Sequence, residues 1–269
     1  METIILSILF LTGLGLLSGL GLGYASEKFK VEIDPRVAAV LKALPGSNCG
    51  ACGKAGCMGL AEAIVKGEAE ANACLAGGQE VAEAVCKALG QQTQPETRSP
   101  QTAVIKCGSG RAICASKFDY IGEETCKDAA AIAGGFLACS KGCLGYNDCI
   151  KVCPFDAMFP NPEKGKPPII DREKCRACEK CIKECPRNVI ILEPKKREVT
   201  MLCASIDKGA QTRKDCKIGC IACQICVKKC PVQAITMFGR IPVVDEEKCT
   251  LCGECIKACP TKTIVNYKS

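Results

Sequence analysis

The spacing of the cysteines constrains this chain more than any other feature of its sequence. Three runs have the form CxxCxxCxxxCP, in which three closely spaced thiols are followed by a fourth just before a proline. These regular runs are Cys175, Cys178, Cys181 and Cys185; Cys220, Cys223, Cys226 and Cys230; and Cys249, Cys252, Cys255 and Cys259. A stretched fourth run places Cys139, Cys143, Cys149 and Cys153 before Pro154. Thiols grouped this tightly predict cages for metal centres.

Three kinds of cysteine chemistry compete for these runs. The chain has 26 cysteines but no histidine, no tryptophan and only seven phenylalanines, so it cannot rely on burial of large side chains alone. A disulfide scaffold is disfavoured, because tight CxxC triplets suit metal cages better than disulfides. Zinc sites usually combine two separated CxxC pairs and often recruit histidine. A third cysteine in each triplet, followed by Cys-Pro, favours [4Fe-4S] clusters of the kind that bacterial ferredoxins hold.

The formal net charge of +7 raises the question of a nucleic-acid partner. That value counts every cysteine as neutral, whereas each oxidised cluster with four thiolates carries a net charge of about −2. Five or six clusters therefore bring the balance to roughly neutral or mildly acidic. Lysine and arginine also alternate with glutamate in short groups instead of forming a basic block. No nucleic-acid partner is expected.

The N-terminal region predicts a membrane anchor. Residues 4–25 carry no charged side chain, and a helix of that length extends about 33 Å, enough to span a bilayer. A cleaved signal peptide is the alternative, but only Glu2 precedes this long stretch and no positive segment does. Lys28 and Lys30 follow it, so the positive-inside bias places the remainder in the cytoplasm. We expect residues 1–26 to cross the lipid bilayer of the bacterial cell membrane once.

Three glycines within this span bear on its partners. Gly15, Gly19 and Gly23 recur at four-residue steps and therefore lie on one helix face. Small residues on one face allow another transmembrane helix to approach closely, which predicts contact with another membrane protein. Glycine is also simply frequent in membrane helices, so both interpretations stay open.

A small helical segment at residues 31–90 has its own cysteine group. Asp34 before Pro35 is typical of a helix start. Four thiols lie among glycines that let the backbone wrap closely about an inorganic core: Cys49, Cys52, Cys57 and Cys74. A [4Fe-4S] cluster is expected here, although a zinc knuckle has the same ligand count. Residues 91–101 are polar and contain two prolines, which predicts a linker.

The remainder of the chain contains an internal repeat. The segment PIID at 168–171, shortly before Cys175, is echoed by PVVD at 242–245, shortly before Cys249. Apolar segments after each Cys-Pro suit short strands in small sheets. The expected ranges are 102–138 for a connecting segment, 139–193 for a first dicluster ferredoxin-like domain, 194–219 for a connector and 220–269 for a second such domain. The predicted fold class is therefore α+β and multidomain, behind a transmembrane helix and a small helical [4Fe-4S] domain.

The two-cluster ferredoxin pattern also pairs the cysteines. The first three cysteines of a run hold one cluster, and the fourth crosses to its neighbour. The expected ligand sets are Cys139, Cys143 and Cys149 with Cys185; Cys175, Cys178 and Cys181 with Cys153; Cys220, Cys223 and Cys226 with Cys259; and Cys249, Cys252 and Cys255 with Cys230. The stretched run departs from the pattern, and its extra residues are expected to form a bulged loop. With the helical domain, five clusters are predicted.

Six cysteines remain outside these sets. We hypothesise a sixth cluster whose ligands are Cys107, Cys126, Cys203 and Cys216. Two of them, Cys107 and Cys203, each end a strand-like stretch, and the other two follow by fewer than twenty residues. Four structural thiols are a nearly equal alternative, because buried cysteine behaves as a small hydrophobe. Cys86 and Cys114 receive no role.

The order of these parts resembles the B-subunit family of the Rnf complex, the ion-translocating ferredoxin:NAD oxidoreductase. A single N-terminal span, a CxxCxxxxC group with a distant cysteine and tandem ferredoxin units cover residues 4–267 and look like the longer clostridial-type form. The resemblance implies an electron-relay subunit of a translocase, without an active site of its own. It also implies ferredoxin as electron donor and other membrane subunits as acceptors, in a complex that drives sodium or proton transport.

The residues themselves support a one-electron relay. The sequence has no flavin or nicotinamide fingerprint and no nucleophile constellation apart from the cysteines. A membrane-tethered polyferredoxin that serves another redox partner is the main alternative. A corrinoid-type iron-sulfur protein shares the N-terminal cysteine domain, but a cobalamin-sized barrel is missing from this sequence. A zinc-rich structural anchor is the third possibility.

Overall fold

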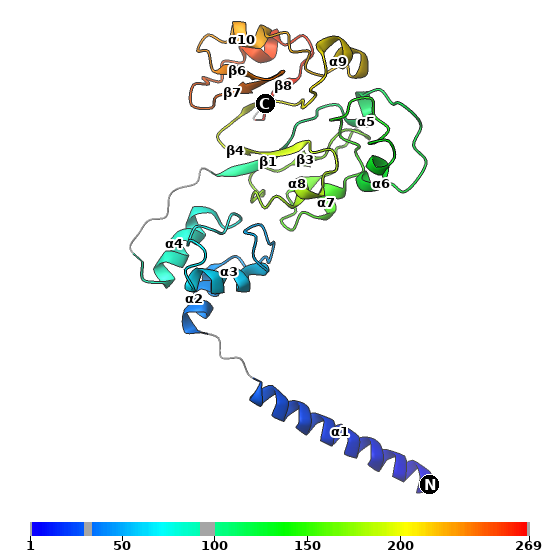
Figure 1. Ribbon diagram of the computed structural model, residues 1–269, viewed down its shortest axis with the longest axis vertical. Coiled ribbons are helices and arrows are strands. Elements are labelled where there is room, and N and C mark those ends of the chain that lie inside the picture. The colour runs from blue at the N-terminus through cyan, green and yellow to red at the C-terminus, as the bar shows by residue number, and fades with distance from the viewer. Residues whose placement is uncertain (1, 30–33, 92–99, 268–269) are drawn as a thin grey trace.

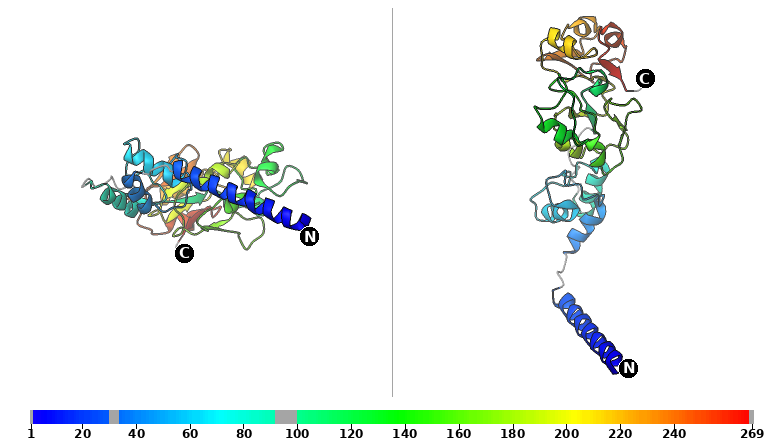
Figure 2. Two further views of the ribbon diagram at one scale, coloured as in Figure 1. Left: turned by 90° about the horizontal axis from the view of Figure 1, so that it is seen from below. Right: turned by 90° about the vertical axis from the view of Figure 1, so that its right-hand side faces the viewer.

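Three parts follow one another along the chain. The structure is a computed structural model that describes residues 2–29, 34–91 and 100–267. An N-terminal helix is followed by a small helical domain, and two mixed α/β units form the opposite end of the molecule (Figures 1 and 2). Most of the predicted linker, residues 92–99, and Lys30 lie outside the described residues.

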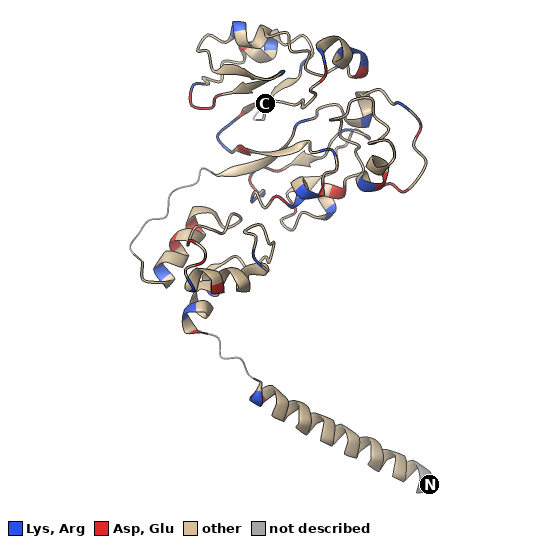
Figure 3. Ribbon diagram, in the orientation of Figure 1, with Lys and Arg blue, Asp and Glu red and all other residues tan. Residues whose placement is uncertain are grey.

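The first helix, α1 (Glu2–Lys28), has no packed face. Leu6 is 72% exposed, and charged residues occur only near the ends of the helix (Figure 3). Ile4–Lys28 is long and apolar enough to cross a membrane, and no other helix in the described parts of the chain is. The Thr12 hydroxyl donates to the Ile8 carbonyl at 2.7 Å, so this polar group is satisfied within the helix. The helix is compatible with a single-pass membrane anchor.

The helical domain consists of α2 (Pro35–Ala43), α3 (Gly56–Val65) and α4 (Gly78–Ala88). Asp34 caps α2, because its carboxylate accepts the Arg36 N–H at 2.8 Å, which confirms the predicted helix start. Val40, Leu60 and Val85 contribute one fully buried side chain from each helix. This small core fixes the helices that flank the N-terminal cysteines.

The rest of the chain folds into two units with the same order of elements. Each has a first strand, a short helix, a hairpin, a second short helix and a last strand (Figure 1). The first unit contains β1 (Gln101–Ile105), α7 (Asp148–Lys151), β2 (Met158–Phe159), β3 (Ile169–Ile170), α8 (Lys180–Glu184) and β4 (Ile190–Pro194). The second contains β5 (Val199–Met201), α10 (Ile225–Lys229), β6 (Ile235–Phe238), β7 (Ile241–Val244), α11 (Glu254–Ala258) and β8 (Ile264–Asn266). The sequence repeat thus has a counterpart in the structure.

Each unit also carries an insertion after its first strand. In the first unit this insertion contains α5 (Gly110–Ile113) and α6 (Cys126–Ala131), and in the second it contains α9 (Gly209–Asp215). These insertions lie between the first strand and the first cysteine loop, so they lie outside the repeated pattern of strands and helices. Five of the six cysteines left over from the predicted ferredoxin sets lie in or beside them, at positions 107, 114, 126, 203 and 216.

Four two-stranded antiparallel sheets organise the units. The first strand of each unit pairs with its last, β1 with β4 and β5 with β8, and the hairpins pair β2 with β3 and β6 with β7. Val104 lies opposite Ile191, and Thr200 lies opposite Val265. Both first strands come from segments that the sequence predicted to be connectors, so residues outside the predicted domain ranges complete both units.

A buried ion-pair network joins the two units. Glu193 in β4 is 2% exposed, and its carboxylate accepts hydrogen bonds from Lys106 Nζ and Thr200 Oγ1, each at 2.9 Å. Arg197 lies 3.4 Å from Glu193 and 2.6 Å from Glu246 in the second unit. Buried charges are stable only when they are paired and hydrogen-bonded. The network therefore holds the end of β1 against the start of the second unit.

Arg172 makes a second contact between the units. Its guanidinium lies over the Tyr267 ring at 4.3 Å and donates to the carbonyls of Lys195 and Arg197, both at 2.9 Å. These carbonyls lie in the turn between β4 and β5, so one side chain fixes both that turn and the C-terminal strand.

We expect Glu193→Gln to destabilise the junction between the units. The substitution keeps the shape of the side chain but leaves Lys106 as a buried cation without its anion, which costs about 3 kcal/mol. The measurement is the urea dependence of far-UV circular dichroism under anaerobic conditions. Glu163→Gln is the control, because its ion pair with Lys166 is exposed and contributes less than about 1 kcal/mol. Equal effects of the two substitutions contradict a stabilising role for the network.

Candidate iron-sulfur centres

The helical domain brings its four predicted thiols together. Cys49 and Cys52 lie in the loop between α2 and α3, Cys57 lies in the first turn of α3, and Cys74 follows that helix. Burial raises the pKa of Cys74, and the three other thiolates, which lie nearby, raise it further. The loop is fixed by Asn48, whose side-chain oxygen accepts the Cys57 N–H at 2.8 Å.

Two cavities of similar size lie within the ferredoxin-like units. One, of about 20 Å³, is lined by Cys153, Cys175, Cys178 and Cys181. The other, also of about 20 Å³, is lined by Cys220, Cys223, Cys226 and Cys259. In each cavity three thiols come from one run and the fourth comes from the other run of the same unit. These are two of the crossed sets that the sequence predicted as cluster ligands.

The backbone of the regular cysteine loops explains why their thiols converge. Ala177 and Glu179, on either side of Cys178, are left-handed, with φ of 51° and 61°. The residues on either side of Cys223 and of Cys252 are left-handed in the same way. Each left-handed residue turns the chain locally, so successive thiols and backbone N–H groups face one point.

The stretched run contains the same loop without the predicted bulge. Gly145 and Asn147 have φ of 72° and 67° and lie on either side of Tyr146. The loop therefore spans residues 143–149, as long as in the regular runs, with Tyr146 in the place of the middle cysteine. Cys139 lies outside this loop. The residues between Cys139 and the start of the loop form a separate turn, in which the Gly142 N–H donates to the Cys139 carbonyl at 3.1 Å.

Cys126 supplies a thiol at the place that Tyr146 leaves without one. It is the first residue of α6, and its backbone N–H donates to the Asp148 carboxylate beside that loop. Burial raises the pKa of the Cys126 thiol, and the backbone N–H groups of Tyr146 and Asp148 oppose this rise. Burial raises the pKa of Cys149 to about 12, and the thiolates of Cys126 and Cys185 are among those that add to this effect. The structure therefore groups four thiols at this site: Cys126, Cys143, Cys149 and Cys185.

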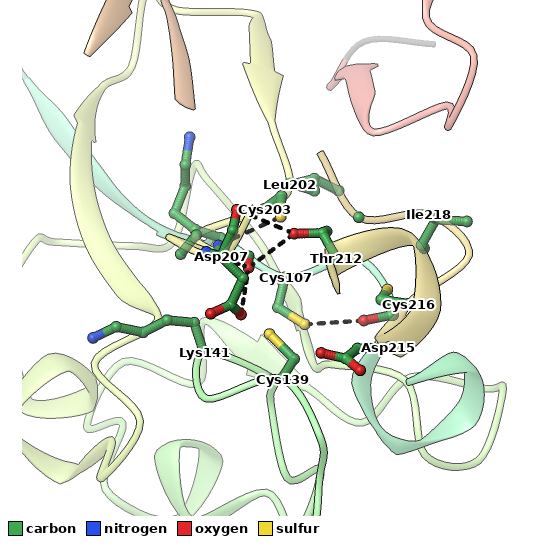
Figure 4. A pocket seen from close by; sticks show the side chains of 15 residues that line it. Cys107, Cys139, Lys141, Leu202, Cys203, Asp207, Thr212, Asp215, Cys216 and Ile218 are labelled. Atoms are coloured by element: carbon green, nitrogen blue, oxygen red, sulfur yellow. Dashed lines mark hydrogen bonds between the residues drawn. The ribbon is translucent and has the colours of Figure 1, made fainter. Parts of the chain in front are cut away.

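The predicted sixth site is changed accordingly. Three of its cysteines, Cys107, Cys203 and Cys216, lie together as the sequence suggested, but their neighbour is Cys139 and not Cys126. These four thiols line a cavity of about 20 Å³ (Figure 4). The exchange follows from the loop geometry, because Cys126 replaces the middle thiol of the loop at 143–149 while Cys139 lies outside it.

The second unit contains another cysteine group, and three of its thiols come from the regular loop that begins at Cys249. Burial raises the pKa of Cys255, and the thiolates of Cys249 and Cys252 raise it further. Cys230, the predicted fourth ligand, packs against the same core. Its sulfur accepts the Ala234 N–H at 3.2 Å.

Backbone donors point at several of the grouped sulfurs. The Ala103 N–H in β1 lies 3.3 Å from the sulfur of Cys175, and the Thr263 N–H lies 3.4 Å from that of Cys259. Burial alone would raise the pKa of Cys259, but hydrogen bonds from Thr263 and Thr261 outweigh it and lower that pKa. Donors of this kind stabilise thiolates and are one means by which a protein tunes the potential of a cluster.

The donor sets fit polynuclear centres. Among the residues that the structure describes, no three His, Cys, Asp or Glu side chains are close enough to hold a single metal ion. The thiolates of a cubane cluster stand further apart than those around one ion, since each binds a different iron atom. Four-cysteine cavities lined by apolar residues and backbone N–H groups have the composition that a [4Fe-4S] cluster needs.

The sequence contained a signal for the shorter loop. Counted back from Cys153, Cys149 and Cys143 stand at the same distances as in the regular runs, and only the middle position differs. The replacement by Cys126 could not be read in this way, because that cysteine lies in the insertion and reaches the loop only through the packing of α6.

Cysteine groups in two ferredoxin-like units, behind a helix long enough to cross a membrane, define an iron-sulfur electron-transfer protein. Comparison with known families agrees, since residues 44–76 match an Fe-S cluster family, residues 168–191 the 4Fe-4S binding domain and residues 219–263 the 4Fe-4S dicluster domain. The chain belongs to the family of B subunits of the Rnf complex, an ion-translocating oxidoreductase. Its 4Fe-4S domains fit an electron-relay role in such a complex.

Three relatives, each of them the B subunit of its own complex, establish this membership. The chain is 40% identical to that of the Na⁺-translocating ferredoxin:NAD⁺ oxidoreductase complex of Acetobacterium woodii, over 87% of this chain and 69% of that protein. It is 40% identical to that of the ion-translocating oxidoreductase complex of Methanosarcina acetivorans, over 93% of each chain. The relative from the proton-translocating ferredoxin:NAD⁺ oxidoreductase complex of Clostridium ljungdahlii is also 40% identical, over 93% of this chain and 87% of that protein.

We expect Cys126→Ala to remove one cluster from the first unit. The loop at 143–149 has no thiol of its own in the middle position, so iron should fall by about four atoms per chain. The measurement is iron and acid-labile sulfide in anaerobically purified protein. Cys86→Ala is the control, because Cys86 is buried in α4 and belongs to none of the groups described above. An iron content equal to that of the control contradicts the assignment of Cys126.

Proposed function

We propose that this chain accepts electrons from reduced ferredoxin and relays them to other subunits of an ion-translocating ferredoxin:NAD oxidoreductase. The names of two relatives state that activity for their complexes. The clusters supply one-electron transfer when bound, and the chain's residues hold them and set the distances between sites. What supports the proposal is a row of cysteine groups that runs from the helical domain into the ferredoxin-like units.

The observation that carries this proposal is the close approach of the helical domain to the first unit. Burial raises the pKa of Cys178, and the thiolate of Cys49, which belongs to the helical domain, raises it further. One groove is lined by Cys74 on one side and by Ala177 and Glu179 on the other. Two sites on separate parts of the chain are thus near enough to interact electrostatically, which is the arrangement that a relay requires.

The two sites within the first unit are also neighbours. The thiolate of Cys181 is among those that raise the pKa of the buried Cys149. The proposed ligand sets, which revise the first of the sequence predictions, are Cys49, Cys52, Cys57 and Cys74; Cys126, Cys143, Cys149 and Cys185; Cys153, Cys175, Cys178 and Cys181; Cys220, Cys223, Cys226 and Cys259; and Cys230, Cys249, Cys252 and Cys255. We assign residues 101–194 to the first unit and 199–266 to the second, because their paired strands close at these positions.

The membrane arrangement is part of the same proposal. The exposed apolar surface of α1 suits lipid and other membrane subunits, and Lys28 lies at the end nearest the helical domain (Figure 3). The positive-inside bias then places all the cysteine groups in the cytoplasm, where ferredoxin is found and thiolates stay reduced.

We expect reduced ferredoxin to reduce the clusters of the purified chain within milliseconds to seconds. The measurement is rapid-freeze EPR under anaerobic conditions, with dithionite as a reference that reduces the clusters without a protein partner. Denatured and refolded ferredoxin without its own clusters is the matched control. If dithionite reduces the clusters and ferredoxin does not, the chain is a polyferredoxin that serves another redox partner.

The proposed orientation has its own test. A protease added to inverted membrane vesicles is expected to digest the C-terminal units of the full chain, whereas right-side-out vesicles protect them. Replacing Leu16 and Leu17 in the middle of α1 with aspartate adds two charges to the span, each unfavourable by about 3 kcal/mol in a bilayer, and should release the chain from carbonate-washed membranes. Digestion in right-side-out vesicles contradicts the cytoplasmic placement.

A further inference from the structure

The cavity lined by Cys107, Cys139, Cys203 and Cys216 resembles the two ferredoxin cavities in size and lining. Its volume of about 20 Å³ equals that of each of those two. Three of its cysteines are 6–7% exposed. Figure 4 shows the sulfurs of Cys107 and Cys139 facing one another inside the cavity. None of the matched families covers these four positions, which lie outside residues 44–76, 168–191 and 219–263.

The cavity is built from both units in equivalent ways. Cys107 follows the first strand of the first unit, and Cys203 follows the first strand of the second. Their backbones pair with each other as an antiparallel bridge. Cys139 and Cys216 then come from the insertions of the first and second unit. Each unit thus supplies two thiols, and neither unit completes the site by itself.

The sulfurs of this cavity also accept backbone hydrogen bonds, as those of the ferredoxin sites do. The N–H groups of Gly110 and Cys143 each lie 3.4 Å from the sulfur of Cys107. The Ser205 N–H lies 3.5 Å from the sulfur of Cys203. A neutral thiol is a weak acceptor, and converging N–H groups are the surroundings that a metal-bound thiolate requires.

A buried cation beside the cavity points to an anionic occupant. Arg187 is 7% exposed, and its guanidinium donates to the carbonyls of Cys139 and Gly142. Within the part of the chain that the structure describes, no carboxylate forms an ion pair with it. A buried guanidinium needs a compensating negative charge, and a cluster with four thiolates carries about −2.

Two carboxylates also line the cavity, and both are held by neighbouring side chains. Asp207 accepts the Ser205 hydroxyl at 3.0 Å, and Asp215 accepts the Gln211 amide at 2.8 Å. Negative charge in the lining of a cavity stabilises the more oxidised form of a cluster bound there and so lowers its reduction potential. The cavity therefore has a buried guanidinium beside it that compensates the charge of an anionic cluster. Its two carboxylates lower the reduction potential of such a cluster.

We propose that Cys107, Cys139, Cys203 and Cys216 hold a sixth [4Fe-4S] cluster, and that this site carries electrons between the two ferredoxin-like units. One electron enters from a reduced cluster in one unit and leaves to an oxidised cluster in the other, with no bond broken and no proton transferred. The existence of this metal site does not depend on the proposed function, whereas the role of the site in the relay rests on that function.

The position of the site supports the bridging role. Cys143, assigned to the nearer site of the first unit, donates its N–H to the sulfur of Cys107. On the other side, Cys203 is close enough to Cys220 for the two thiols to interact electrostatically, and Cys220 lines a cavity of the second unit. The site therefore lies next to a cluster ligand in each unit.

The metal content of the full, anaerobically purified chain tests the site. About 24 iron atoms per chain are expected for six clusters, and about 20 overturn the proposal in favour of free thiols. Zinc measured in the same sample distinguishes a zinc site, since about one zinc with about 20 irons also overturns it. Cys139→Ala and Cys203→Ala should each lower iron by about four atoms. Cys114→Ala is the matched control, because Cys114 is equally buried beside the cavity but does not line it.

The bridging role is tested by the same variants in rapid-freeze EPR with reduced ferredoxin. In the unaltered chain we expect ferredoxin to reduce all clusters in the fast phase. In Cys139→Ala we expect reduction in that phase only for the clusters on the side of the junction where ferredoxin delivers its electrons. Dithionite should reduce every remaining cluster in both proteins. If all five remaining clusters of the variant still react in the fast phase, the bridging role is overturned. If ferredoxin fails to reduce even the unaltered chain, the proposed function fails and the iron count still decides the site.

Discussion

Four thiols from distant parts of the chain must meet at one point for each metal centre, and the arrangement of this protein depends on that requirement. The apolar cores of the two ferredoxin-like units contain cysteines among their buried members, and only 4% of the residues are aromatic. Sheets of two strands and helices of four or five residues have little stability of their own. Metal binding and folding are therefore coupled in these units, because ligation closes loops that hydrophobic burial would leave open.

The regular parts of the fold could be predicted because their cause is local. Ala177 and Glu179 turn one loop by their left-handed backbone, and the same spacing repeats in the runs around Cys223 and Cys252. The crossing cysteines follow from the same repeat, as the cavity that contains Cys153 and three thiols of the next run illustrates. In such loops the spacing of the cysteines is enough to predict the geometry of the chain.

The parts that could not be predicted depend on packing between segments. Cys126 and Cys139 exchange the places that the sequence suggested, and no spacing rule connects Cys126 with Tyr146, because α6 brings them together. The Glu193 network was not anticipated either, since its partners at 106, 197 and 200 meet only when β1 and β5 are aligned. Short-range patterns fix what each loop can bind, and the contacts between units fix which thiols share a site.

The pairing of Cys107 with Cys203 has a consequence for how the protein is made. The cluster that we propose at this junction has two ligands from each unit, so it could form only after the second unit has been synthesised and has docked on the first. Its insertion would therefore come at the end of maturation, after the clusters that each unit can assemble alone. Oxygen damage to the cluster at the junction would leave the clusters within each unit intact. An oxidised chain would then keep most of its iron but would no longer transfer electrons between its two units.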